Sequence, residues 1–241
     1  MRLCVFSDVH SNLEALESVL KAAASAKVDR ILCAGDLVGY GPDPVACIQL
    51  LREHATQVVC GNHDWAAVGR LELEWFNEFA RAGVEWTRQQ LTDLERDYLK
   101  GCSLIWQDSD VTLAHGSLHE PEKFHYVLDT AHAGASLEIQ KTPVAFIGHT
   151  HVPGIFIQEG SSVSFLRTPE IRIDRRLKYL INVGSVGQPR DGDPRACWCL
   201  YDMENATCEV RRVPYPVELT QAKVRAAGLP EFLAERLAYG Y

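Results

Sequence analysis

Long apolar runs are missing from this sequence. No stretch approaches the roughly 20 consecutive apolar residues that a membrane-spanning helix needs. Met1 and Arg2 lead directly into a short strand-like run, so we expect no secretory signal peptide. Internal repeats and low-complexity segments are absent as well. The sequence therefore predicts a protein with no membrane partner.

A basic stripe is also missing. The formal net charge at pH 7 is −8, and the densest basic stretch, residues 172–178, is short. Proteins that bind nucleic acids usually concentrate Lys and Arg on one face. This charge balance therefore predicts no stable nucleic-acid partner.

The 8 cysteines lack the spacing of a zinc ribbon: Cys197 and Cys199 are separated by one residue, without the two-residue spacer or a second pair. Cys4, Cys33 and Cys60 lie inside apolar runs, where a free cysteine behaves as a small buried hydrophobic residue. Disulfides are typical of secreted proteins. We interpret the thiols as reduced and the protein as cytoplasmic.

A length of 241 residues is sufficient for one domain with a full hydrophobic core. We predict a single domain over residues 1–241 with a helical insertion at about 65–100, where Thr92 and Glu95 match a capping box. Before this insertion, short apolar runs alternate with segments of helical spacing. That alternation is typical of a parallel sheet covered by helices.

Residues 153–213 differ in pattern from the first 60 residues. Short strand-like runs are separated there by Gly, Pro and Asp turns, without helical segments between them. This pattern favours an antiparallel sheet packed on the first, within an α/β fold. Other strands are expected at 104–106, 111–114 and 144–147, a helix near 130–140, and two closing helices at about 216–227 and 230–239.

Five short polar clusters each follow an apolar run and together supply two Asp, one Asn and several His. Loops at the carboxyl ends of strands converge in sheets of this kind, so we expect these side chains to meet at one edge. A single histidine would not support a site, but five convergent segments do. The clusters are Asp8-Val9-His10, Gly35-Asp36, Gly61-Asn62-His63-Asp64, His115-Gly116 and Gly148-His149-Thr150-His151.

Carboxylate, carboxamide and imidazole groups are ligands of hard and borderline divalent cations, and no cysteine lies in the clusters. The donor set predicts two divalent metal ions, manganese first, with iron, zinc, cobalt or nickel as alternatives. Asp36 is the candidate for a shared ligand, because Gly35 lets the backbone turn sharply off the strand. A shared carboxylate holds two metals about 3.5–4 Å apart, the spacing that clamps a phosphoryl group.

In this order, the clusters resemble the motif set of the calcineurin-like metallophosphoesterases, across residues 3 to about 203. Residues 35–44 and 182–190 resemble the small bacterial and archaeal phosphodiesterase branch of that superfamily. The resemblance implies a four-layer αββα fold, a two-sheet β-sandwich flanked by helices. It implies one metal held by Asp8, His10, Asp36 and His151, and a second held by Asp36, Asn62, His115 and His149.

The activity implied by the resemblance is hydrolysis of phosphodiester bonds, in small or nucleotide-like substrates, by a metal-activated water. His63 would act as general acid or as stabiliser of the attacked phosphate. Serine/threonine phosphatases carry Asp-Arg-Gly where this chain has Val38-Gly39-Tyr40, which disfavours protein dephosphorylation.

Two other functions remain open. Cleavage of the phosphoanhydride bonds of dinucleoside polyphosphates would use the same core. A non-catalytic protein-binding scaffold would keep the fold, but the presence of His63 beside every expected ligand argues against it.

For several residues, the sequence is compatible with either a functional or a purely structural role. Arg190 could grip a substrate phosphate or lie at a solvated hairpin tip. Tyr40 could stack on a base or cover the loop, and Asp64 could orient His63 or cap a helix. Exposed edges of the second sheet would allow a homo-oligomer. Residues expected to have no role in the site are His119, His125, His132 and Trp75, the last placed in the core.

Overall fold

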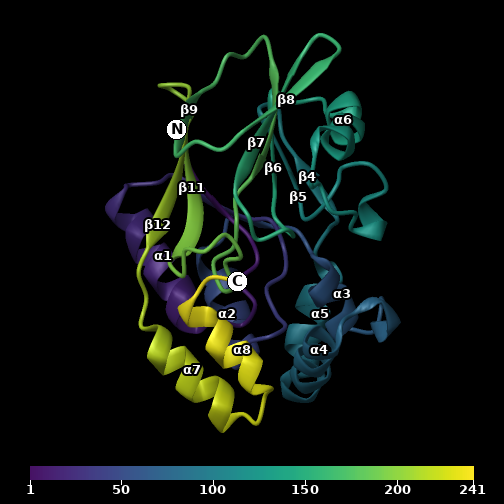
Figure 1. Ribbon diagram of the computed structural model, residues 1–241, viewed down its shortest axis with the longest axis vertical. Helices are drawn as coiled ribbons and strands as arrows, with labels where there is room; N and C mark the ends of the chain where they lie inside the picture. Colours follow the sequence, from purple (N-terminus) through teal and green to yellow (C-terminus); the bar gives the residue numbers. More distant parts are fainter.

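The computed structural model describes residues 1–241 and contains two six-stranded β-sheets (Figure 1). The first sheet has the order β3-β2-β1-β11-β12-β9, with β1 parallel to β2 and antiparallel to β11. Its strands are β1 (Arg2–Phe6), β2 (Arg30–Cys33), β3 (Gln57–Val58), β9 (Glu170–Arg172), β11 (Ala196–Asp202) and β12 (Thr207–Val213).

The second sheet has the order β4-β5-β6-β10-β7-β8, with β6 parallel to both β5 and β10. Its strands are β4 (Ile105–Gln107), β5 (Val111–Ala114), β6 (Val144–Ile147), β7 (Gly154–Glu159), β8 (Ser162–Leu166) and β10 (Lys178–Asn182). The strands expected at 104–106, 111–114 and 144–147 are therefore confirmed, to within one residue.

The two sheets pack face to face because neighbouring residues of a strand point to opposite faces. In β1, Leu3 and Val5 lie in a core cluster with Val144 and Ile181 of the second sheet. Cys4 and Phe6 point the other way, into a cluster with helical residues such as Leu16. One strand thus contributes to both the inter-sheet core and the core under the helices.

Helices α1 (Leu13–Ser25) and α2 (Pro44–His54) pack on the outer face of the first sheet, and α6 (Thr130–Ile139) packs on the outer face of the second. The expected helix–sheet–sheet–helix arrangement is confirmed. All 8 cysteines are free, and Cys4, Cys33 and Cys60 are buried. None of the helices combines the length and the apolarity that crossing a lipid bilayer would require.

We expected the strands of residues 153–213 to form one antiparallel sheet, but they do not. Strands β7, β8 and β10 belong to the second sheet, whereas β9, β11 and β12 extend the first. Local turn signals predict where strands end but not which strands pair, because pairing depends on contacts distant in sequence. The long-range pair of β1 with β11 and the parallel pair of β6 with β10 have no local signature.

We expected residues 65–100 to be helical throughout, but the α-helices are interrupted over 68–77, where only a short 3-10 helix forms. Gly69 adopts a left-handed conformation (φ 77°) just after the first of them. Thr92 and Glu95 do form the capping box, but Trp75 is 86% exposed, so its assignment to the core was wrong. The elements are α3 (Asn62–Ala67), the 3-10 helix η1 (Leu73–Trp75), α4 (Glu78–Gln90) and α5 (Asp93–Gly101).

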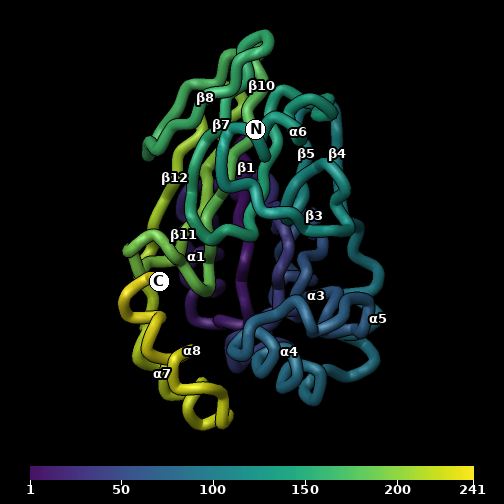
Figure 2. The backbone as a smooth tube through the Cα atoms, turned by 45° about the vertical axis from the view of Figure 1, so that its right-hand side comes forward, coloured from purple at the N-terminus to yellow at the C-terminus, as the bar shows by residue number.

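The chain closes with α7 (Val217–Ala226), α8 (Glu231–Glu235) and the 3-10 helix η3 (Arg236–Ala238), as expected. Figures 1 and 2 place α7, α8 and α4 at the same end of the molecule. Phe79 of α4 packs on Phe232 of α8, with ring centroids 4.6 Å apart. The C-terminal helices are therefore joined to the helical segment that follows β3.

A short 3-10 helix, η2 (Pro121–Lys123), lies in the loop before α6.

Candidate metal centre

The polar residues that follow five strands meet at one place. Asp8 follows β1 and Asp36 follows β2, whereas His115 follows β5 of the other sheet. His149 and His151 lie in the loop after β6. The centre therefore draws side chains from the strand ends of both sheets, as the positions of the motifs in the sequence predict.

One group of donors consists of Asp8, His10 and His151, all buried. His151 Nε2 lies 3.2 Å from Asp8 Oδ1, and His10 Nε2 lies 3.7 Å from the same oxygen. The Nε2 atoms of His10 and His151 are 3.0 Å apart. Three donor atoms from two loops therefore converge on one small volume.

A second group consists of Asp36, His115 and His149, also buried. Asp36 Oδ2 lies 3.2 Å from His115 Nε2, and that nitrogen is 3.0 Å from His149 Nδ1. Asp36 Oδ2 also lies 3.6 Å from His10 Nε2. Asp36 thus stands between the two groups, in the position that a shared carboxylate would need.

The imidazole rings are oriented by backbone carbonyl groups. His10 Nδ1 lies 3.1 Å from the Val38 oxygen and His151 Nδ1 2.5 Å from the Gln188 oxygen. If each Nδ1 donates its proton there, the two Nε2 atoms of neutral rings face each other with lone pairs at 3.0 Å. A cation between them would turn this repulsion into attraction, so the donor set fits a divalent metal ion.

Asn62 supplies a further observation in favour of a cation. Its side-chain oxygen is buried and has no hydrogen-bond partner. A buried polar atom without a partner is costly, and in native proteins it usually has an explanation such as an ion. Asn62 begins α3 next to His63, whose backbone N–H donates to Asp36 Oδ1 at 2.9 Å. Its carboxamide could therefore serve as a ligand near Asp36.

Asp64 takes part in capping α3, one of the two roles considered for it, as the third residue of a capping box whose N-cap residue is Gly61. It lies at the third position of α3, and its carboxylate accepts backbone N–H groups of Gly61, Leu37 and Val38. Burial and the neighbouring Asp36 raise its pKa to about 7. Asp64 therefore holds the loop after Asp36 against the start of α3 and does not orient the His63 ring.

The charges of the centre are coupled. Burial opposes ionisation of Asp8, but His151 and His115 outweigh it and lower the pKa of the Asp8 carboxyl. Burial likewise opposes protonation of His115, yet Asp36 raises the pKa of His115 to about 9. Burial lowers the pKa values of His10 and His149 well below the usual range. The carboxylates are thus ionised at neutral pH and attract positive charge.

His63 packs between Tyr40, at a centroid distance of 4.6 Å, and Phe76, at 5.0 Å. Burial lowers its pKa to about 4, with Asp36 opposing and His151 contributing. The ring is therefore neutral at neutral pH, and its buried Nδ1 has no hydrogen-bond partner. A neutral imidazole can still donate one N–H to a phosphate oxygen, which favours a stabilising role over that of a charged acid.

Backbone strain concentrates at the donor residues. Asp8, His10, Asp36, His149 and His151 all have positive φ, between 48° and 70°. Non-glycine residues adopt this conformation rarely, and it clusters at functional sites. The sequence around these residues did not predict this backbone conformation.

Close approaches to the carboxylates also require glycine. A Cβ at Gly61 would lie 2.0 Å from Asp36 Oδ1, and one at Gly148 would lie 2.3 Å from Asp8 Oδ2. Any side chain at these two positions would displace a donor atom.

Arg190 lies beside the centre and not at a solvated hairpin tip. Its backbone N–H donates to the His151 oxygen at 3.2 Å, and its half-buried guanidinium bonds to Gln188 Oε1 at 2.7 Å. Tyr40 is 7% exposed, and its ring lies 4.7 Å from that of His10. The covering role of Tyr40 is therefore the one that the contacts favour.

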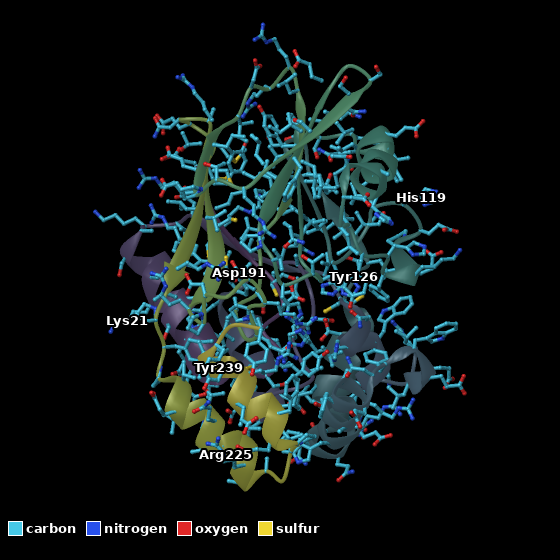
Figure 3. All side chains as sticks on the ribbon, in the orientation of Figure 1. Lys21, His119, Tyr126, Asp191, Arg225 and Tyr239 are labelled. Atoms are coloured by element: carbon cyan, nitrogen blue, oxygen red, sulfur yellow. The ribbon has the colours of Figure 1, made fainter.

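The three histidines expected not to be ligands lie outside the centre. His119 and His125 are about half exposed and face Glu120, and His132 pairs with Asp129. Figure 3 shows His119 at the periphery of the molecule.

A cavity of about 480 Å³ between α2 and α5 contains none of the predicted site residues.

Sequence reasoning missed three neighbours of the centre. Phe76 contacts His63, and Tyr126 stacks on His149 at a centroid distance of 3.8 Å. Leu237 approaches from the C-terminal helices and lines a small cavity with His10 and Tyr40. Nothing in the local sequence indicated any of these three residues.

A family model described as the calcineurin-like phosphoesterase superfamily domain matches residues 1–206. The chain belongs to this family. An uncharacterized protein of Methanocaldococcus jannaschii is 34% identical over 247 residues, covering 99% of this chain and 98% of that protein. The family and three overlapping groups of possible metal donors, the third being His10, Asp36 and His63, together support a hydrolase.

Solved structures agree with this assignment. A metallophosphoesterase from Sphaerobacter thermophilus is 40% identical with a TM-score of 0.89, covering 100% of this chain and 99% of that one. A hypothetical protein from Pyrococcus horikoshii OT3 has a TM-score of 0.81 at 17% identity, covering 100% and 98%. The first supports both family and fold, and the second supports the fold alone.

Proposed function

We propose that the protein is a binuclear metal-dependent phosphoesterase that hydrolyses phosphodiester bonds of small or nucleotide-like substrates. The position of Asp36 carries this proposal: its Oδ2 lies 3.2 Å from His115 Nε2 and 3.6 Å from His10 Nε2, within reach of both donor groups. We assign one ion to Asp8, His10, Asp36 and His151, and a second to Asp36, Asn62, His115 and His149. Manganese is the first candidate for both.

Bound divalent ions would supply Lewis acidity, which acidifies a water molecule and neutralises charge on a phosphoryl group. The protein's own groups would do the rest. In the neutral rings of His10, His115 and His151, a proton on Nδ1 directed to a carbonyl oxygen would leave Nε2 free for an ion. At His115, whose pKa is raised to about 9, the ion would have to displace a proton. His63 would donate an N–H to the attacked phosphate, and Tyr40 would exclude water from one side of it.

The phosphoanhydride alternative is favoured by one observation. The Arg190 guanidinium is half-buried beside His151, and its hydrogen bonds go only to Gln188 and Tyr40. It is thus available to a second phosphate. A scaffold function has no comparable support, because His63 and the complete donor set converge. We further expect a cytoplasmic protein without a stable nucleic-acid partner, in which exposed sheet edges permit a homo-oligomer.

Hydrolysis assays with manganese test the proposal directly. We expect the purified protein to hydrolyse bis-p-nitrophenyl phosphate and to lose this activity when a chelator removes the metal. Diadenosine tetraphosphate, assayed in parallel, measures phosphoanhydride cleavage. Preference for the second substrate would favour the alternative. No cleavage of either substrate with any of the five candidate metals would contradict both.

A further inference from the structure

A small cavity adjoins the loop that carries two of the metal donors. Its volume is about 170 Å³, and its wall includes Thr150, the residue between His149 and His151 in the chain. Val152 of the same loop lines it as well. The cavity therefore lies against the loop that follows β6.

A second segment connects the cavity to the metal centre. The Tyr126 ring stacks on that of His149, with a centroid distance of 3.8 Å and an interplanar angle of 11°. The next two residues, Val127 and Leu128, line the cavity. Figure 3 shows Tyr126 near the middle of the molecule, in contrast to the peripheral His119. Residues 126–128 thus cover a metal donor at one end and form a wall of the cavity at the other.

Two aromatic side chains of the β7–β8 hairpin form another part of the wall. Phe156 is buried, whereas Phe165 is 43% exposed, and their ring centroids are 4.8 Å apart. Leu128 is 67% exposed. Because Phe165 and Leu128 line the same cavity, a ligand inside it would remove apolar surface of both from water.

The polar side chains of the wall are already hydrogen-bonded within it. Asn182 Nδ2 donates to the Gly148 oxygen at 2.6 Å and to Thr150 Oγ1 at 2.9 Å. Asn182 Oδ1 accepts the Gly184 N–H at 2.9 Å, and Thr150 Oγ1 donates to the Val152 oxygen at 3.2 Å. Since these groups have their partners, the cavity favours an apolar ligand over a polar one.

Arg167 is the one charged residue that lines the cavity. It follows β8 and is exposed, and no carboxylate shares the wall with it. In a protein with a net charge of −8, a wall with one cation and no acid favours a ligand that carries negative charge. The cavity therefore suits the apolar part of an anionic molecule.

We propose that this cavity binds an aromatic ring of the substrate's organic group while the phosphate of the substrate lies at the metal centre. The size supports a single ring, because an apolar cavity of about 150 Å³ binds benzene. The inference rests on the proposed function and narrows its substrates to esters that carry an aromatic group. Leu128 and Phe165 determine this specificity, and neither takes part in the chemical step.

Two phosphonates that cannot be hydrolysed as esters test the cavity. Benzylphosphonate carries an aromatic ring and ethylphosphonate does not, while the charged group is the same in both. We expect the manganese-loaded protein to bind benzylphosphonate about tenfold more tightly, as partial burial of a phenyl ring implies. Calorimetry measures both dissociation constants without turnover, and inhibition of bis-p-nitrophenyl phosphate hydrolysis provides a second measurement.

Leu128→Asp should bring the two dissociation constants to within about twofold of each other, because a carboxylate in the wall opposes burial of the ring. Its charge acts on both phosphonates alike, so the ratio of the constants isolates the effect on the ring. Leu94→Asp is the matched control, because Leu94 is 57% exposed on α5 and does not line the cavity. This control should keep the wild-type preference for benzylphosphonate.

Two further variants separate loss of the wall from misfolding. Leu128→Met keeps an apolar side chain of similar volume and should keep the preference. Phe165→Ser removes an aromatic contact and should reduce the preference severalfold.

The possible results distinguish this proposal from the proposed function. Equal binding of the two phosphonates by the wild type, or no binding of benzylphosphonate, would overturn the proposal even if diesters are cleaved. A preference that persists in both Leu128→Asp and Phe165→Ser would overturn it as well. If no ester is cleaved but Leu128→Asp removes the preference, the proposed function fails and the aromatic site stands.

Discussion

Backbone groups, more than neighbouring side chains, orient the functional residues. His115 Nδ1 lies 2.8 Å from the Ala34 oxygen, and His10 and His151 make equivalent contacts with other carbonyl groups. In the neutral ring, each contact fixes one tautomer and directs Nε2 toward the centre, where a cation would replace the second proton that the raised pKa of His115 implies. Strand ends thus specify the protonation pattern of the centre as well as its position.

Replacing His63 should lower the rate of catalysis without changing the amount of metal bound. We expect His63→Ala to lower kcat by about 100-fold or more, the usual effect of losing a preorganised hydrogen-bond donor to the charge that develops in the transition state. Metal content should remain at the wild-type level, because the proposed ligand sets do not include His63, although its ring lies close enough to His10 and Asp36 to form a third group of possible donors. Steady-state kinetics and elemental analysis of the same preparation measure the two quantities.

His132→Ala is the control for this variant, since His132 is exposed on α6 and bonded to Asp129. It should leave kcat unchanged. Loss of one metal equivalent in His63→Ala would instead make His63 a ligand, and an unchanged kcat would remove it from the reaction.

Among the elements, the antiparallel partner of β1 is stabilised by its own turn. Asp202 ends β11 and is paired in register with Arg2 of β1. Its carboxylate accepts backbone N–H groups of Glu204 and Asn205, both at 3.1 Å, and the Arg2 Nε at 3.0 Å. Asp202 therefore fixes the β11–β12 turn and joins it to the strand that leads to Asp8.

Replacing Asp202 by Asn should lower the free energy of unfolding by about 1–2 kcal/mol at pH 7, chiefly through weaker hydrogen bonds in the turn. The Arg2 ion pair adds little, because Arg2 is 46% exposed. Urea denaturation measures this difference. Asp97→Asn, at an exposed residue of α5, is the control and should change stability by about 0.5 kcal/mol or less.

The effect of Asp202→Asn should depend on pH. Hydrogen bonds from Asn205 and the charge of Arg2 lower the pKa of Asp202 to about 2. The carboxylate therefore contributes its full stability above the ordinary Asp pKa, near 4, and loses it as the pH falls toward 2. The difference between wild type and Asp202→Asn should be smaller at pH 3 than at pH 6. An equal difference at both values would contradict this account.

At the scale of the molecule, the positions of the strands and of the metal donors could be predicted from the sequence better than the pairing of the strands. Strand ends could be predicted because apolar runs stop abruptly at Asp8, Asp36 and His149. The distribution of residues 153–213 between two sheets could not, because it depends on long-range pairs such as β1 with β11. The packing of η3 on the site loops, which brings Leu237 beside His10 and Tyr40, could not be predicted from the sequence either.

The centre joins both sheets, so metal binding should stabilise the whole molecule. Asp8 and Asp36 extend from the first sheet, and His115 and His151 from the second. An ion bound only by the folded state adds about 2.7 kcal/mol at a concentration 100 times its Kd. In a chain of this length that corresponds to a rise in Tm of roughly 5–10 °C.

Thermal unfolding of chelator-treated protein, with and without added manganese, measures this difference. Asp36→Asn should reduce the manganese-induced shift to a small fraction of the wild-type value, because Asp36 lies between the two donor groups. Asp97→Asn should keep the full shift. A wild-type Tm that stays constant as manganese is added, under conditions where elemental analysis finds no bound ion, would mean that these carboxylates and imidazoles do not bind the metal. The convergence of both sheets on Asp36 would then need another explanation.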